Sequence, residues 1–167
     1  MTQATLMQNF GFTHYVLSAN VDGISHADSL RPAADGANSL NGIVGHIVRG
    51  RAPIHDLLGL EPVIDPGRLE RYKQRQPPVV ADGEGVLPFD ELVAALNTSQ
   101  EAVMGRLAEM GDEELAAECA HVLEPGKRSQ VGVMLAAFNF HEAYHAGQTG
   151  LLRRIVGKPG ALLGPED

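Results

Sequence analysis

The clearest chemical potential in this sequence lies in two histidines of the segment FHEAYHAGQ, residues 140–148. His141 and His145 are four positions apart, so on a helix their side chains lie on one face, about one turn apart. Two imidazoles placed in this way can both reach one metal ion. The apolar stripe of the predicted helix passes through the same positions. We therefore expect His141, His145 and Gln148 to point into the protein.

A third candidate ligand stands much earlier in the chain. His46 lies in an apolar segment between Ile43 and Arg49, and helical phase places it near the apolar side. Three histidines from two helices leave open coordination positions, which is typical of a catalytic rather than a structural site. Neutral imidazole suits several divalent metals, so we expect a divalent ion, with zinc or nickel before copper or iron. The weaker candidates are His14, His26, His55 and His121, and for His14 we expect a surface or core-edge position.

Residues 141–145 also match H-E-x-x-H, the metalloprotease pattern in which the glutamate is the general base. The rest of the sequence does not fit a protease. Gln148 and Leu151 stand where a metzincin has a glycine and its third histidine, and Glu166 lies in the terminal tail, where it does not fit a gluzincin. We interpret Glu142 as a surface residue beside the site. The sequence names no general acid or base.

Four stretches with helical periodicity must position these histidines. They cover residues 5–24, 40–58, 90–110 and 130–157. Ser39 and Ser129 are the predicted N-caps of the second and fourth helices, and Pro53 predicts a kink near residue 50. Residues 59–88 hold five prolines and form a long crossover, with a short helical piece at 68–76. No strand-length alternating run is present. The pattern predicts an all-α fold, a four-helix bundle with a long crossover between helices 2 and 3.

The composition is that of a globular protein. The 167 residues fit one domain, and 44% hydrophobic with 20% charged residues is ordinary. Acidic residues outnumber basic ones 21 to 13, and a net charge of −8 argues against binding to nucleic acid or to an anionic membrane. No apolar run approaches the roughly 20 residues of a membrane span. With no signal-peptide pattern and one cysteine, Cys119, we expect a cytoplasmic protein.

Two longer segments, SLNGIVGHIVRGRAPIHDLLG and HEAYHAGQTGLLRRIVGKP, resemble the DinB/YfiT-like family of four-helix, often dimeric metalloenzymes. The resemblance covers most of the chain and implies a single DinB-like four-helix-bundle domain over residues 1–167. Gly147 and Gln148 match the glycine and glutamine that typically follow the histidine pair. Pro53 stands in the stretch where members often carry an aromatic residue. The metal ligands that the resemblance implies are His46, His141 and His145.

The resemblance also implies a function. Family members with known activity include transferases and isomerases that use the thiols bacillithiol or mycothiol. A divalent-metal-dependent enzyme is therefore expected, either a thiol-dependent transferase or a hydrolase acting on a small molecule. Its partner would be that substrate, together with a low-molecular-weight thiol in the case of the transferase. The alternative is a non-catalytic metal-binding or stress-response protein of the same fold.

Two groups of residues are candidates for binding a cofactor or a second copy of the chain. A basic cluster in the crossover could receive a carboxylate-bearing cofactor, although we favour a solvated helix face because acidic residues are interspersed; its members are Arg68, Arg71, Lys73 and Arg75. Apolar residues also extend beyond one narrow stripe of the first and fourth helices, which predicts a homodimer. These residues are Phe12, Tyr15, Val16, Phe140 and Tyr144.

Overall fold

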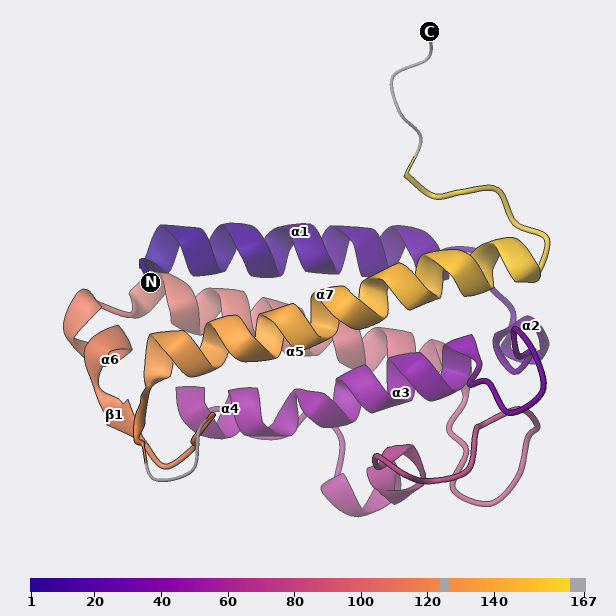
Figure 1. Ribbon diagram of the computed structural model, residues 1–167, viewed down its shortest axis with the longest axis horizontal. Helices are drawn as coiled ribbons and strands as arrows, with labels where there is room; N and C mark the ends of the chain where they lie inside the picture. Colours follow the sequence, from indigo (N-terminus) through magenta and orange to yellow (C-terminus); the bar gives the residue numbers. More distant parts are fainter. Residues whose placement is uncertain (124–126, 163–167) are drawn as a thin grey trace, which may run out of the picture.

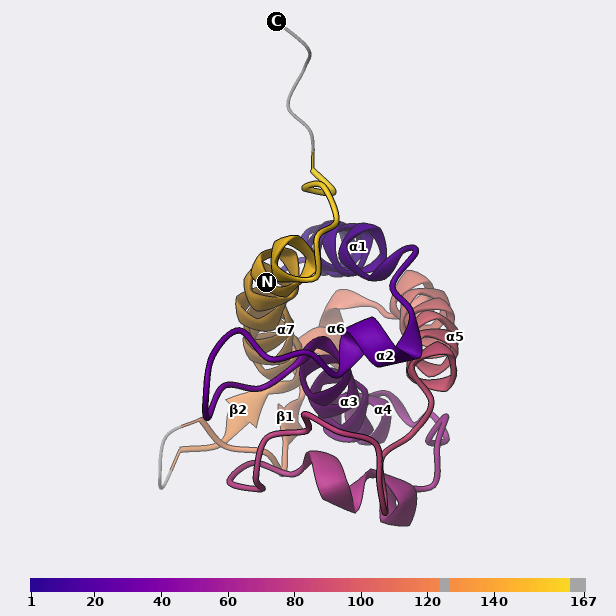
Figure 2. The same cartoon turned by 90° about the vertical axis from the view of Figure 1, so that its right-hand side faces the viewer.

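Four helical segments build the protein, as the periodicity predicts (Figure 1). The computed structural model describes residues 1–123 and 127–162. In the end view of Figure 2, α1 and α3 lie at opposite corners of the bundle, and each packs against both α5 and α7. The predicted four-helix bundle is therefore confirmed. The bundle segments are α1 (Gln3–Val21), α3 (Leu40–Gly50) continued by α4 (Ala52–Leu58), α5 (Phe89–Glu109) and α7 (Val131–Ile155).

The second segment is divided at Arg51, as Pro53 predicts. Proline has no N–H to donate to the carbonyl four residues earlier, so the helical ladder is interrupted at this point. Pro53 instead occupies the first turn of α4, where a missing N–H costs nothing. At the start of α3, Ser39 is the predicted N-cap and accepts a hydrogen bond from the Gly42 amide at 3.3 Å.

Short elements connect these segments. They are α2 (His26–Ser29), the 3-10 helix η1 (Pro66–Tyr72), α6 (Asp112–Ala116) and the strands β1 (Glu118–Cys119) and β2 (Ser129–Gln130). The prediction that Ser129 caps the last helix is wrong. Ser129 pairs with Cys119 in the small antiparallel ladder, and the Val131 amide donates to the Ala117 carbonyl at 2.9 Å. This pairing delays the start of α7 to Val131.

A layer of buried polar side chains divides the core into two apolar clusters. On α1 the layer falls between Phe10 of one cluster and Leu17 of the other. On α7 it falls between Leu135 and Ala146. All four bundle segments contribute to this layer, which we call the polar layer: Thr13, Arg51, His55, Ser99, Gln100, Asn139 and Glu142.

The crossover between α4 and α5 is fastened to α3 by specific hydrogen bonds. The Tyr72 hydroxyl donates to Oδ1 of Asn41 at 2.9 Å and accepts from the Leu87 amide at 2.8 Å. The Ser39 hydroxyl donates to the Val79 carbonyl. The crossover is thereby held as a fixed wall along the outer side of α3 (Figure 2).

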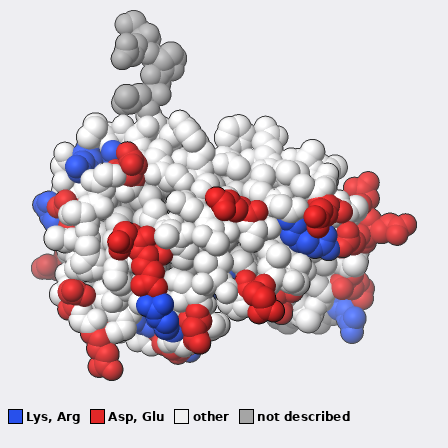
Figure 3. All heavy atoms as spheres, turned by 180° about the vertical axis from the view of Figure 1, so that it is seen from behind, with Lys and Arg blue, Asp and Glu red and all other residues white. Residues whose placement is uncertain are grey.

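The surface is mostly uncharged on the face behind the view of Figure 1, and acidic side chains there outnumber basic ones (Figure 3). None of the helices within residues 1–123 and 127–162 combines the length and the hydropathy needed to span a membrane.

Candidate metal centre

The three predicted histidines meet between α3 and α7. The Nε2 atom of His141 lies 3.2 Å from Nε2 of His46 and 3.1 Å from Nε2 of His145. One ring nitrogen of each residue lies within 4.8 Å of the others, so the set could hold one metal ion. All three rings are half-buried. They lie at the seam between the two helices rather than at the centre of the bundle, where helical phase had placed them.

The imidazole rings of His46 and His145 are each oriented by a hydrogen bond at Nδ1, the nitrogen that points away from the cluster. Nδ1 of His46 lies 3.1 Å from the Tyr72 backbone carbonyl, and Nδ1 of His145 lies 2.7 Å from Oε1 of Gln148. Both oxygens only accept, so each Nδ1 carries the proton and each Nε2 presents a lone pair. Two lone pairs thus face the Nε2 of His141. Such convergence is what a cation requires, and carbonyl partners on the second nitrogen are typical of metal-bound histidine.

The electrostatics of the cluster favour neutral imidazoles. Burial, followed by the charges that His145 and His46 acquire on protonation, lowers the pKa of His141 to about 4. Burial also lowers the pKa of His145. Neutral imidazole is the form that binds metals. The side chains present therefore fit a divalent ion, which His46, His141 and His145 would hold.

Gly45 allows Tyr72 to reach His46. A Cβ atom at Gly45 would lie 2.2 Å from the Tyr72 ring, far inside contact distance. We therefore expect Gly45→Ala to displace Tyr72 and with it the carbonyl that orients His46. Metal affinity should fall by about 10-fold or more, the usual effect of losing such a partner. Isothermal titration with Zn²⁺ measures the affinity. The control is Gly11→Ala, because an added Cβ at Gly11 meets nothing within 4 Å. Unchanged affinity in Gly45→Ala would show that Tyr72 does not orient the ligand.

Glu142 does not lie at the surface, contrary to our interpretation of the H-E-x-x-H pattern. Its side chain is 2% exposed and accepts from Arg51, with 2.5 Å from Nε to Oε1 and 2.8 Å from Nη2 to Oε2. Burial raises the pKa of the Glu142 carboxyl, while the charge and hydrogen bonds of Arg51 act against that rise. The guanidinium keeps its proton and offers two N–H donors to the two oxygens of Glu142, an arrangement that favours the carboxylate and forms an ion pair. Glu142 is therefore part of the polar layer. Because its carboxylate is bound to Arg51, it is not the general base that the metalloprotease pattern assigns to this position.

The other four histidines have partners outside the cluster. His55 is buried, with Nε2 2.7 Å from the Ser99 hydroxyl and Nδ1 2.7 Å from the Glu61 carbonyl. His26 accepts from the Phe89 amide, His121 lies near Asp56, and His14 lies near the Ser18 hydroxyl. The expectation that these four are not ligands of the cluster agrees with their positions.

The lowered pKa of His14 predicts that the folded protein loses stability in acid. Burial, and then the charge of Arg51, lowers its pKa to about 4. The unfolded chain takes up this proton near pH 6.5, so the free energy of unfolding should decrease as the pH falls from about 6.5 to about 4. Urea unfolding of the metal-free protein at about pH 7.5 and about pH 5 measures the decrease. It should be smaller in His14→Gln than in the wild type; equal decreases would mean that His14 is not involved.

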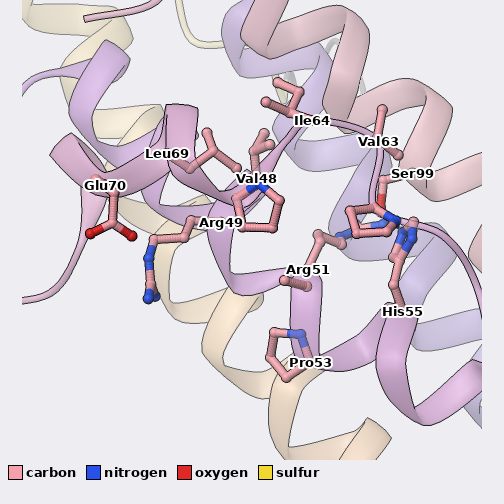
Figure 4. Close-up of a pocket in the computed structure, with 13 residues that line it drawn as sticks. Val48, Arg49, Arg51, Pro53, His55, Val63, Ile64, Leu69, Glu70 and Ser99 are labelled. Atoms are coloured by element: carbon pink, nitrogen blue, oxygen red, sulfur yellow. The ribbon is translucent and has the colours of Figure 1, made fainter. Parts of the chain in front are cut away.

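A cavity of about 120 Å³ lies beside the break between α3 and α4. It is lined from α3, α4, α5 and the crossover, largely by apolar side chains. Figure 4 shows Arg49 and Glu70 on one side of it and His55 and Ser99 on the other. Arg49, which lies one helical turn after His46 on α3, lines this cavity, whereas His46, His141 and His145 do not.

Three of the four basic residues of the crossover, Arg68, Arg71 and Lys73, have partners within the protein. Arg68 pairs with Glu91, and Lys73 pairs with Glu70. Arg71 donates to the carbonyls of residues 77 and 78. These contacts favour the solvated helix face over a cofactor site for this segment.

A helical bundle with three convergent histidines at one seam defines the class of protein. The sequence profile of the DinB superfamily matches residues 10–149, and the chain belongs to that superfamily, whose fold is a four-helix bundle. A crystal structure of a conserved protein from Enterococcus faecalis is similar to this chain, with a TM-score of 0.68 and 16% identity. The similarity covers 93% of this chain and 97% of that one, and at this identity it shows the fold alone. Comparison with curated proteins gave no significant match.

Proposed function

We propose that this protein is a divalent-metal-dependent enzyme, with His46, His141 and His145 as the ligands and zinc or nickel as the metal. The observation that carries the proposal is the convergence of three Nε2 atoms at 3.1 and 3.2 Å, two of them fixed as lone-pair donors by carbonyl oxygens. Three protein ligands leave at least one coordination position for a substrate.

We further propose that the reaction is thiol transfer to a small molecule. Three neutral ligands leave the double positive charge of the ion uncompensated, which favours an anionic group in the open position. A bound divalent metal lowers the pKa of a thiol and presents it as the thiolate nucleophile. Half-burial of the three rings leaves them within reach of a small ligand.

Cobalt substitution tests this function. Protein loaded with Co²⁺ is titrated with cysteine, and with S-methylcysteine as the control that cannot form a thiolate. We expect cysteine alone to produce a thiolate-to-cobalt charge-transfer band. If Co²⁺ binds but no band forms with cysteine or other low-molecular-weight thiols, thiol transfer is wrong. The hydrolase and the non-catalytic metal-binding protein would then be the remaining alternatives.

We also propose that the protein is a homodimer. Large apolar side chains are exposed on α1 and α7: Phe12, Tyr15, Phe140, Tyr144 and Leu151. Val16, which the sequence grouped with them, packs partly buried against the core. Contiguous exposed apolar surface usually marks an interface, and two-fold dimers are the commonest way to cover it.

The dimer predicts a mass of about twice 17.8 kDa in solution. Phe140, the most exposed of these side chains at 73%, is the position to change. Phe140→Glu places a charge in the proposed interface, so we expect the variant to be monomeric. Light scattering across a dilution series measures both proteins. A wild type of monomer mass at micromolar concentration would contradict the dimer.

A further inference from the structure

We infer that the buried pair of Arg51 and Glu142 is a positioning device for the metal centre, and this inference rests on the proposed function. Glu142 is the residue after His141 and lies three before His145 on α7. Arg51 follows Gly50, at which a Cβ atom would lie 3.7 Å from the His141 ring. The ion pair therefore joins the two sides of the seam at the level of the imidazoles.

The pair connects all the segments of the bundle. Both oxygens of Glu142 accept from Arg51, and Nη2 of Arg51 also donates to Oε1 of Gln100 on α5 at 3.0 Å. Gln100 in turn donates to the Phe10 carbonyl of α1 at 3.3 Å. The Arg51 guanidinium thus joins α7 and α5 to the break between α3 and α4, and the Gln100 amide joins α5 to α1. Its Nη1 atom is buried without a hydrogen-bond partner among the described residues.

The register of α7 against α3 decides whether the three imidazoles meet. A shift of one residue moves a side chain by about 1.5 Å along a helix and turns it by about 100°. Metal ligands tolerate deviations of only about 0.2 Å. Apolar contacts in the two core clusters are non-directional, so they discriminate between registers less sharply than directional hydrogen bonds do. The two-pronged contact between Arg51 and Glu142 has one geometry, so it selects the register in which His141 and His145 face His46.

The test separates positioning from stability. Arg51→Met combined with Glu142→Leu replaces the pair by apolar side chains of similar size, a change that folded proteins often accept. We expect this double variant to fold but to bind Co²⁺ about 10- to 100-fold more weakly, with an altered visible spectrum of the bound ion. Should the double variant not fold, Glu142→Gln, which keeps the shape of the side chain, is measured in the same way.

A matched control is available at the other end of α7. Arg153 is buried and donates to the carbonyls of Asn20, Asp22 and Pro159. We expect Arg153→Met to lose stability yet to bind Co²⁺ with wild-type affinity and spectrum. Wild-type affinity and spectrum in the folded double variant, or in Glu142→Gln, would overturn this inference alone. Failure of the wild type to bind Co²⁺ would overturn the proposed function together with it.

Discussion

Replacing Glu142 by alanine in the metal-free protein is expected to lower the free energy of unfolding by about 3–5 kcal/mol. The substitution leaves the Arg51 guanidinium 2% exposed, with its charge unpaired and two hydrogen bonds lost. Desolvation of an uncompensated charge is the cause of the large penalty. Urea unfolding in the presence of a chelator measures the loss without a contribution from bound metal.

Two comparisons identify the source of that loss. Arg68 and Glu91 form an ion pair with side chains 51% and 34% exposed, so Glu91→Ala should cost less than about 1 kcal/mol. Arg51→Met combined with Glu142→Leu removes both charges and should recover most of the loss. If Glu142→Ala costs no more than Glu91→Ala, the buried pair does not carry the energy assigned to it.

Saturating zinc should strongly stabilise the wild type. At 100 times the dissociation constant, a ligand bound only by the folded state adds about 2.7 kcal/mol to the free energy of unfolding. His141 lies between the other two imidazoles, with its Nε2 close to both of theirs. Its removal should therefore abolish the effect.

Thermal unfolding with zinc and with chelator measures this stabilisation in the wild type and in His141→Ala. Gly147→Ala, in the same stretch of α7, is a matched control because a Cβ there meets nothing within 4 Å. It should respond to zinc as the wild type does. A zinc-induced shift of equal size in His141→Ala would place the ion elsewhere.

Local periodicity was sufficient to predict the helices of the bundle and the shared face of His141 and His145, whereas the grouping of His46 with them rested also on the family resemblance. Pro53 predicts the break between α3 and α4, and the spacing of four between His141 and His145 requires one helical face. The capping chemistry of Ser39 is likewise local. Ser129 shows the limit of such reasoning, because its pairing with Cys119 depends on a segment ten residues away.

The surroundings of the cluster depend on contacts between distant segments, which periodicity does not encode. Tyr72 supplies a backbone carbonyl to His46, and any residue type could do so. The sequence holds a weak indication that Glu142 is buried. Glu142 lies on the same helical stripe as Leu135, Asn139 and Ala146, all of which are buried. That stripe, rather than the stripe through the histidines, faces the centre of the bundle. The identity of its partner, Arg51, could be found only from the fold.

The most direct test of the central claim is the metal content of the purified protein after loading with zinc and dialysis. Elemental analysis should find one ion per chain in the wild type and in His121→Ala, which removes a histidine that lies near Asp56 rather than in the cluster. In His145→Ala the content should fall to a small fraction of that value, because one of three ligands is lost. Equal zinc in His145→Ala and the wild type, or none in the wild type, would contradict a metal centre formed by His46, His141 and His145.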